Sequence, residues 1–151
     1  MIQESVHFTN NADEWGTPIP FYNELNQEFC FTLDPCCDVS NHKCEKYFTK
    51  IDNGLNKSWA GEVVFCNPPY SELEKWMKKC STEARNGAFV VLLCPARTDT
   101  IAFHTWIYNP HTQQFRDGVT VRFIKGRLKF QYAENSAPFP SMVVIFQKPL
   151  K

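Results

Sequence analysis

Four consecutive residues, Asn67-Pro68-Pro69-Tyr70, combine a side-chain amide, a rigid double-proline turn and an aromatic ring. The Asn67 amide oxygen accepts hydrogen bonds, and the prolines, with φ held at about −65°, have no backbone N–H to donate. Asn67 Oδ1 and the Pro68 carbonyl can therefore each accept one hydrogen of a planar exocyclic amine. Such bonds bias the nitrogen lone pair out of conjugation and toward an electrophile, while Tyr70 can stack on the attached ring.

The same residues have a plainer explanation, because Asn-Pro and Pro-Pro pairs are common in loops and a following tyrosine often only packs. Their position favours chemistry instead. The turn directly follows the apolar run 63–66, which predicts a strand. Since ligands of open α/β sheets bind just beyond the carboxyl ends of strands, the sequence favours an active-site turn.

An earlier segment places a carboxylate at another strand end. Apolar residues recur at spacings of three and four after Pro18, which predicts a helix over about residues 18–29. The β-prone run 30–33 ends at Asp34, where the following Pro35 disfavours helical geometry. We therefore expect a first strand with Asp34 at its carboxyl end. Before the Asn67 turn, the remaining expected elements are a weak helix around 39–46, a strand at 46–49 and a turn at 52–55.

A helix and a buried strand are expected after the turn. Residues 71–86 have helical periodicity, with Ser71 as the N-cap and Gly87 as the stop. The continuous apolar run 88–94 is typical of a strand inside a parallel sheet. Strand, helix and strand together predict a βαβ crossover, and hence an α/β fold. Antiparallel strands are expected at 119–124, 127–132 and 142–146.

Composition sets broad limits on the chain. Its 151 residues, 43% of them hydrophobic, suit one domain with one core. Sixteen basic and sixteen acidic residues cancel, so a basic surface must be local, as in 75–79 and 122–129. Without a secretory signal or an apolar run of about 20 residues, a cytoplasmic protein that does not enter membranes is expected. Residues 1–12 are polar and predict a flexible arm before a single domain over 13–151.

The cysteines indicate neither disulfides nor a metal site. There are seven, an odd number, and most lie in apolar runs where a reduced thiol packs as a small hydrophobe. Cys36, Cys37, His42 and Cys44 are close in sequence, but their spacing does not match the paired CxxC ligands of structural zinc. Buried thiols are therefore favoured over metal ligands.

Five segments resemble one family when they are taken together. They are Asp13-Glu14-Trp15-Gly16-Thr17-Pro18, Phe31-Thr32-Leu33-Asp34-Pro35, Val64-Phe65-Cys66-Asn67-Pro68-Pro69-Tyr70-Ser71, Leu93-Cys94-Pro95-Ala96-Arg97-Thr98-Asp99-Thr100 and Gly126-Arg127-Leu128-Lys129-Phe130. Over nearly the whole chain this set resembles the DNA N6-adenine methyltransferases, most closely the short phage-type enzymes of the Dam-like family. The resemblance implies an abbreviated Rossmann-like fold, S-adenosylmethionine as cofactor, DNA as partner, and a phage or prophage protein in a bacterial host. The oligomeric state stays open.

The resemblance also implies residues that hold the cofactor. Trp15, Thr17 and Pro18 would lie near the methionine end of S-adenosylmethionine, with Thr17 on its carboxylate. Asp34 would lie beneath the cofactor, near its charged amino group or ribose, and Asp52 could contact its ribose or adenine. Two of these residues have a structural alternative. Thr17 could be a plain N-cap, and Asp52 could be an ordinary turn residue, which is the interpretation we favour for Asp52.

In the same resemblance, the catalytic residues Asn67, Pro68, Pro69 and Tyr70 would hold an adenine flipped out of the duplex. The substrate-binding residues would be Arg97, Asp99, Arg127 and Phe130. A salt bridge between Arg97 and Asp99, and a core position for Phe130, are the alternatives. The reaction would be direct in-line methyl transfer to N6, with no covalent cysteine intermediate and no required general base.

Two departures from larger methyltransferases carry predictions. No glycine-rich turn directly follows Asp34, and only thirty-two residues separate Asp34 from Asn67. We therefore expect an abbreviated adenosine pocket and six strands. No segment is large enough for a separate target-recognition domain, which leaves recognition to loops such as 98–118 or to the N-terminal arm and predicts short or relaxed sequence preference. Two rival functions remain open: methylation of another planar amine, in an RNA base or a protein glutamine, and an inactive domain that binds DNA or cofactor.

Overall fold

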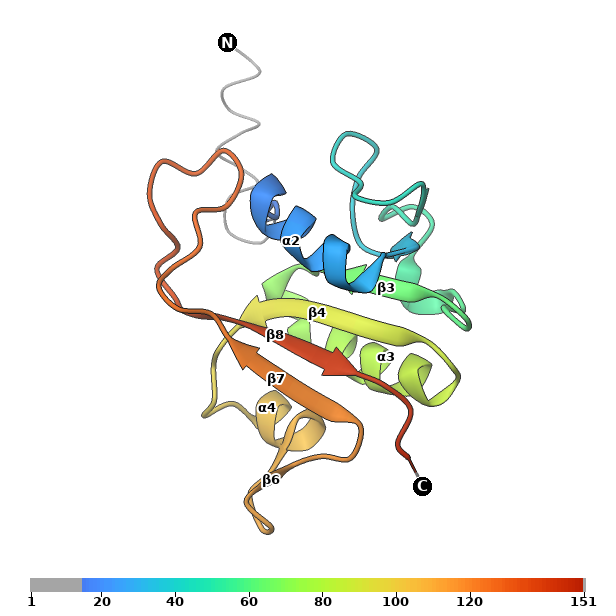
Figure 1. The fold of residues 1–151 in the computed structure, drawn as a ribbon, viewed down its shortest axis with the longest axis vertical. Helices are drawn as coiled ribbons and strands as arrows, with labels where there is room; N and C mark the ends of the chain where they lie inside the picture. The colour runs from blue at the N-terminus through green and yellow to red at the C-terminus, as the bar shows by residue number, and fades with distance from the viewer. Residues whose placement is uncertain (1–14, 151) are drawn as a thin grey trace.

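The computed structural model describes residues 15–150, so the predicted arm at 1–12 lies outside the described residues. Its elements are α2 (Ile19–Phe29), β1 (Leu33–Asp34), β2 (Lys46–Tyr47), η1 (Gly54–Asn56), β3 (Val63–Cys66), η2 (Tyr70–Glu72), α3 (Leu73–Arg85), β4 (Phe89–Pro95), α4 (Ile101–Trp106), β5 (Tyr108–Asn109), β6 (Gln114–Phe115), β7 (Val119–Phe123) and β8 (Ser141–Phe146). Helix α2 covers one face of a central sheet, and α3 and α4 lie on the other face (Figure 1).

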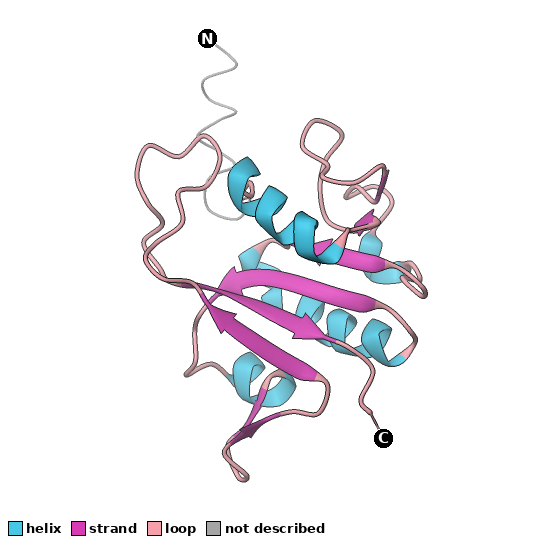
Figure 2. Ribbon diagram, viewed as in Figure 1, coloured by secondary structure: helices cyan, strands magenta, loops and turns pink. Residues whose placement is uncertain are grey.

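The central sheet has six strands in the order β2-β1-β3-β4-β8-β7. The first four are parallel, with Val63 to Cys66 of β3 paired to Phe89 to Leu92 of β4. Strand β8 is antiparallel to both β4 and β7 (Figure 2). The predicted α/β class, the βαβ crossover through α3 and the antiparallel C-terminal strands are therefore confirmed.

The two faces of the sheet are covered by different kinds of contact. On one face, Tyr22 of α2 packs its ring against Phe65 of β3 at 5.1 Å, and Arg122 of β7 forms a bidentate ion pair with Glu28. On the other face, α3 buries an apolar stripe of Trp76, Met77, Cys80 and Ala84. Strands β4 and β8 lie between these layers and are almost wholly buried, as their continuous apolar sequences require.

Three predicted features of secondary structure are wrong. The helix around 39–46 does not form, because Asp38 and its neighbours satisfy one another locally: Ser40 N donates to Asp38 Oδ1 and Asp38 N donates to Asn41 Oδ1, each at 2.9 Å. Ser71 is not an N-cap, since it lies inside η2 and Glu72 precedes α3. The strand at 127–132 is a loop, which we call the 124–140 loop.

Other boundaries are closer to prediction. The first strand contains only Leu33–Asp34, yet Asp34 is its last residue as expected. Helix α3 stops before Gly87, whose φ of +105° continues the chain in the left-handed region that glycine tolerates best. Within residues 15–150 no helix is both long and apolar enough to cross a bilayer.

Candidate active site

An open cleft of about 930 Å³ lies at the carboxyl ends of β1 and β3. Its lining includes Trp15, Thr17, Asp34, Asn67 and Pro69, which come from three separate stretches of the chain. This volume lies toward the upper end of the range of about 300 to 1,000 Å³ that is usual for small-molecule sites. The fold therefore brings the predicted cofactor segment, the first-strand carboxylate and the double-proline turn to one cavity.

Asp34 is a buried carboxylate at this cleft, with a side chain only 3% exposed. Burial raises its pKa to about 6, although backbone hydrogen bonds from Lys43 and Cys36 favour the charged form and oppose the shift. Lys43 N donates to Oδ2 at 2.9 Å and Cys36 N donates to Oδ1 at 3.3 Å. These two amides hold the carboxylate without neutralising it, so it remains able to meet a cation or a hydroxyl group.

The Asn67 amide is held by residues about fifty positions earlier in the chain. Its Nδ2 donates to the Trp15 carbonyl and, at 2.9 Å, to Thr17 Oγ1. Its Oδ1 accepts a hydrogen bond of 3.1 Å from the Tyr70 hydroxyl. A carbonyl-type oxygen has two acceptor directions, so Oδ1 keeps one for a substrate.

The two prolines of the turn differ in what their carbonyls do. The Pro69 carbonyl accepts from Glu72 N at 3.1 Å, which starts η2. No donor within residues 15–150 is bonded to the Pro68 carbonyl. Asn67 Oδ1 thus keeps one acceptor direction, and the Pro68 carbonyl has no bonded donor in the described part of the chain; the sequence predicts that these two oxygens bind the amine.

Tyr70 lies in an aromatic cluster rather than on an open surface. Its ring is 9% exposed and meets Phe139 edge-on at 5.7 Å. Trp15 packs against both Phe130 and Phe139, each at 5.4 Å between ring centroids. Burial also raises the pKa of Tyr70, so its hydroxyl stays protonated and can donate to Asn67. Sequence reasoning missed Phe139, whose only signal was its place between two prolines just before β8.

The predicted substrate residues fall around this aromatic cluster. Arg97 is exposed, and its guanidinium carbon lies 5.7 Å from the ring centroid of Phe139. Asp99 is exposed too, and the ion pairs among residues 15–150 do not join it to Arg97. Arg127 donates to the Ala137 carbonyl at 3.3 Å, inside the 124–140 loop. Phe130 is 2% exposed, which matches its structural alternative as a core residue.

Asp52 and Thr17, two residues predicted to bind the cofactor, can each be compared with their structural alternative. The Asp52 carboxylate accepts hydrogen bonds from the backbone and hydroxyl of Thr49, as an ordinary turn aspartate does, and it does not line the cleft. Thr17 is not the N-cap of α2, because Pro18 occupies that position and its carbonyl accepts from Tyr22 N. Thr17 lines the cleft, but its hydroxyl accepts a hydrogen bond from Asn67 Nδ2. Lys43, which holds Asp34, had no signal in the sequence.

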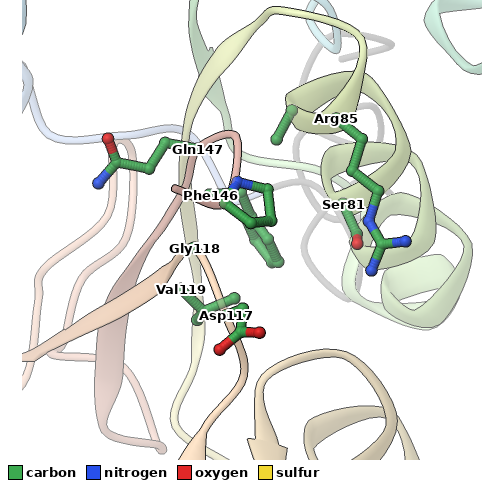
Figure 3. A pocket seen from close by; sticks show the side chains of 9 residues that line it. Ser81, Arg85, Asp117, Gly118, Val119, Phe146 and Gln147 are labelled. Atoms are coloured by element: carbon green, nitrogen blue, oxygen red, sulfur yellow. The ribbon is translucent and has the colours of Figure 1, made fainter. Parts of the chain in front are cut away.

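A second hollow lies at the other end of the sheet and is too small to hold a small-molecule ligand. Ser81 and Arg85 of α3 line it together with Asp117 and Gly118, which precede β7 (Figure 3). Its volume of about 10 Å³ is at most enough for a single water molecule. Of these two hollows, only the larger cleft has room for a small-molecule ligand.

Comparisons with known proteins find one matching family and two similar phage proteins. The model of the family described as DNA N-6-adenine-methyltransferase (Dam) matches residues 4–151. A DNA N-6-adenine-methyltransferase of Haemophilus phage HP1 (strain HP1c1) is 26% identical over 150 residues, covering 97% of this chain and 86% of that protein. One of Escherichia phage T1 is 29% identical over 93 residues, covering 60% of this chain and 39% of that protein.

Among solved structures, the chain is similar to a proposed methyltransferase from Thermoplasma acidophilum. The TM-score is 0.38 at 10% identity, and the match covers 78% of this chain and 57% of the other.

Proposed function

Because the chain belongs to the DNA N-6-adenine-methyltransferase (Dam) family, we propose that it methylates the N6 amine of adenine in DNA with S-adenosylmethionine as donor. The observation that carries this proposal is the anchored Asn67 amide, which lines the cleft and precedes Pro68, whose carbonyl has no bonded donor within residues 15–150. Both named relatives are phage proteins, which supports a phage or prophage enzyme acting on DNA in the bacterial cytoplasm.

The cleft is suited to a cofactor of this size and charge. Its volume exceeds that of a nucleoside with an amino-acid tail, and the buried Asp34 offers an acceptor at its base. We assign Trp15 and Pro18 to the methionine end, and Asp34 to the amino group or ribose. Thr17 lines the same cleft, but its hydroxyl is bonded to Asn67. When bound, S-adenosylmethionine supplies a sulfonium methyl group, which is already a strong electrophile. The chain therefore has to contribute position and charge stabilisation rather than activation of the donor.

The double-proline turn supplies that contribution. Asn67 Oδ1 and the Pro68 carbonyl accept the two N6 hydrogens, so the lone pair of the nitrogen points away from the ring plane. As N6 gains positive charge, the same two oxygens stabilise it, and their bonds strengthen where charge develops. Burial raises the pKa values of the Cys66 and Cys94 thiols, so neither of these two supplies a thiolate nucleophile.

Base binding requires a rearrangement within the aromatic cluster. Tyr70 has only 9% of its surface exposed because Phe139 and its neighbours cover it. An adenine that stacks on Tyr70 must displace the edge of Phe139. Arg97, whose guanidinium lies against the same Phe139 ring, is then well placed to meet a phosphate of the flipped nucleotide.

The test is mass spectrometry of nucleosides from unmethylated DNA incubated with the purified protein and S-adenosylmethionine. We expect N6-methyladenine from the natural protein and a loss of at least about 100-fold in Asn67→Ala, since a transition-state acceptor is removed. Binding of S-adenosylmethionine should change by less than about threefold in that variant. Asn86→Ala is the matched control, because Asn86 lies exposed at the end of α3, and it should retain full activity.

Absence of methylated adenine from the natural protein, with cofactor binding demonstrated by calorimetry, would overturn the proposal. Parallel incubations with RNA and with a glutamine-bearing protein would then show which planar amine is methylated. Failure on all three substrates would identify an inactive binding domain.

A further inference from the structure

Both hydrogens of the Asn67 side-chain nitrogen are hydrogen-bonded. An amide NH₂ group has two hydrogens, and here one goes to the Trp15 carbonyl and the other to Thr17 Oγ1. The Thr17 hydroxyl is 2.9 Å away, and its side chain is 3% exposed, so water does not compete for it. The nitrogen end of Asn67 therefore faces residues 15–17 and cannot face the substrate.

The Trp15 carbonyl makes this orientation the only favourable one. A carbonyl oxygen accepts hydrogen bonds and never donates, so an amide turned by 180° would set Asn67 Oδ1 against another acceptor. The hydroxyl of Thr17 can donate or accept and would tolerate either orientation alone. Together the two groups hold Nδ2 in place and direct Oδ1 toward Tyr70 and the amine site, where its second acceptor direction is needed.

Residues 15–17 are themselves fixed by the 124–140 loop. The Gly16 carbonyl accepts from Gln131 N at 2.8 Å, and the Trp15 ring packs on Phe130 and Phe139. A Cβ at Gly16 would lie 2.9 Å from Gln131 Oε1, so only glycine fits this close approach without a shift. Residues 15–17, which anchor Asn67, are thus held in place by the 124–140 loop, which is distant in the sequence.

From these contacts we infer that Thr17, with the Trp15 carbonyl, is a positioning residue that fixes the Asn67 amide for reaction. The inference rests on the proposed function, and it assigns Thr17 a role other than binding the cofactor carboxylate. Thr17 acts through Asn67, so its removal lowers the rate of the chemical step more than it weakens binding of either substrate.

The first experiment compares Thr17→Val with Thr17→Ser. Valine keeps the shape and removes the acceptor, whereas serine keeps the hydroxyl. We expect kcat to fall at least about tenfold in Thr17→Val, with the KM values for DNA and S-adenosylmethionine within about threefold of the natural protein, and kcat to recover in Thr17→Ser. Thr105→Val is the control, since Thr105 is exposed on α4 and bonds only the Ile101 carbonyl.

A rise in the KM for S-adenosylmethionine at unchanged kcat would overturn the inference and return Thr17 to the cofactor. Equal impairment in the valine and serine variants would overturn it as well, because the hydroxyl would then be irrelevant.

A second measurement does not depend on activity. In nitrogen-15 NMR spectra of the natural protein, the Asn67 side-chain NH₂ is identified by its disappearance in Asn67→Ala. Both of its hydrogens should exchange with solvent at least about tenfold more slowly than those of the exposed Asn86 side chain, because both are bonded. Exchange as fast as that of Asn86 would overturn the positioning role. Slow exchange without any DNA methylation would support the anchor while refuting the proposed function.

Discussion

Asp34 shows how a single residue can be tuned by its place at a strand end. The parallel sheet buries its carboxylate, and two backbone amides bond it without providing a full positive charge. Burial therefore prevails, and the pKa rises to about 6. A carboxylate held in this way meets a cationic ligand with little hydration left to lose, which suits the proposed contact with the cofactor.

The raised pKa predicts how stability depends on pH. An aspartate in the unfolded chain titrates near 3.8, whereas folded Asp34 titrates near 6, so the folded state binds more protons in between. The contribution of Asp34 to the free energy of unfolding is therefore largest below about pH 4 and falls by about 3 kcal/mol as the pH rises through 6. Urea unfolding at several pH values should show this fall in the natural protein.

Asp34→Asn provides the comparison, because its amide does not titrate. The difference in unfolding free energy between the two proteins should change between pH 4 and 6 and stay constant above about pH 7. Parallel pH profiles for the two proteins would contradict a raised pKa at Asp34, since all other carboxylates are common to both.

At the scale of elements, the short turn η1 closes the cleft against the segment that follows β1. A Cβ at Gly54 would lie 2.1 Å from the Pro35 carbonyl oxygen, so η1 touches the chain directly after Asp34. The Gly54 carbonyl also accepts from Trp59 Nε1 at 3.1 Å, and Trp59 is fully buried. Glycine at this position therefore lets two loops form one wall of the cleft.

Gly54→Ala should accordingly damage both stability and cofactor binding. The added methyl group must push η1 away from Pro35, and we expect a loss of about 2 kcal/mol in unfolding free energy with at least about tenfold weaker binding of S-adenosylmethionine. Gly61→Ala is the control: its φ of +79° strains an alanine by about 1 kcal/mol, but nothing lies within 4 Å of its Cβ. It should destabilise modestly and leave cofactor affinity unchanged in calorimetry. Equal affinities in both variants would contradict the role of η1.

At the scale of the whole molecule, the two segments that join β4 to β7 and β7 to β8 lie in different places. Residues 98–118 form α4 and the β5–β6 hairpin, which extends away from α2 (Figure 1). The 124–140 loop lies near the start of α2 and bonds Gly16 through Gln131. We therefore expect the 124–140 loop, which carries Lys125, Arg127 and Lys129, to contribute more than residues 98–118 to DNA recognition.

A recognition surface of this size predicts short or relaxed sequence preference. A single loop can reach the edges of only a few base pairs, so methylation of random-sequence DNA should occur at many sites that share at most about four defined positions. Sequencing that detects N6-methyladenine would map these sites, with Asn67→Ala as the background. Strict methylation of one long site would contradict the prediction.

Much of this protein follows from local sequence. The run 63–66 with its Asn-Pro-Pro-Tyr turn, the helix that became α3 and the apolar strand β4 were all predictable, because periodicity and proline act over a few residues. The same signals predicted the parallel sheet and Asp34 at a strand end, whereas the family resemblance rested on five motif segments taken together. The helix at 39–46 failed at this same local scale, since polar side chains there bond their own backbone in place of helical carbonyls.

Tertiary structure alone decided how the site is held. The Asn67 amide takes its orientation from Trp15 and Thr17, and Tyr70 is covered by Phe139. No pattern within a short window reports contacts between residues about fifty or seventy positions apart in the chain. The burial that shifts Asp34 likewise depends on several segments converging. Local sequence indicated which groups could do chemistry, and long-range packing determined which end of the Asn67 amide faces residues 15–17, because orientation is set by partners that only folding brings together.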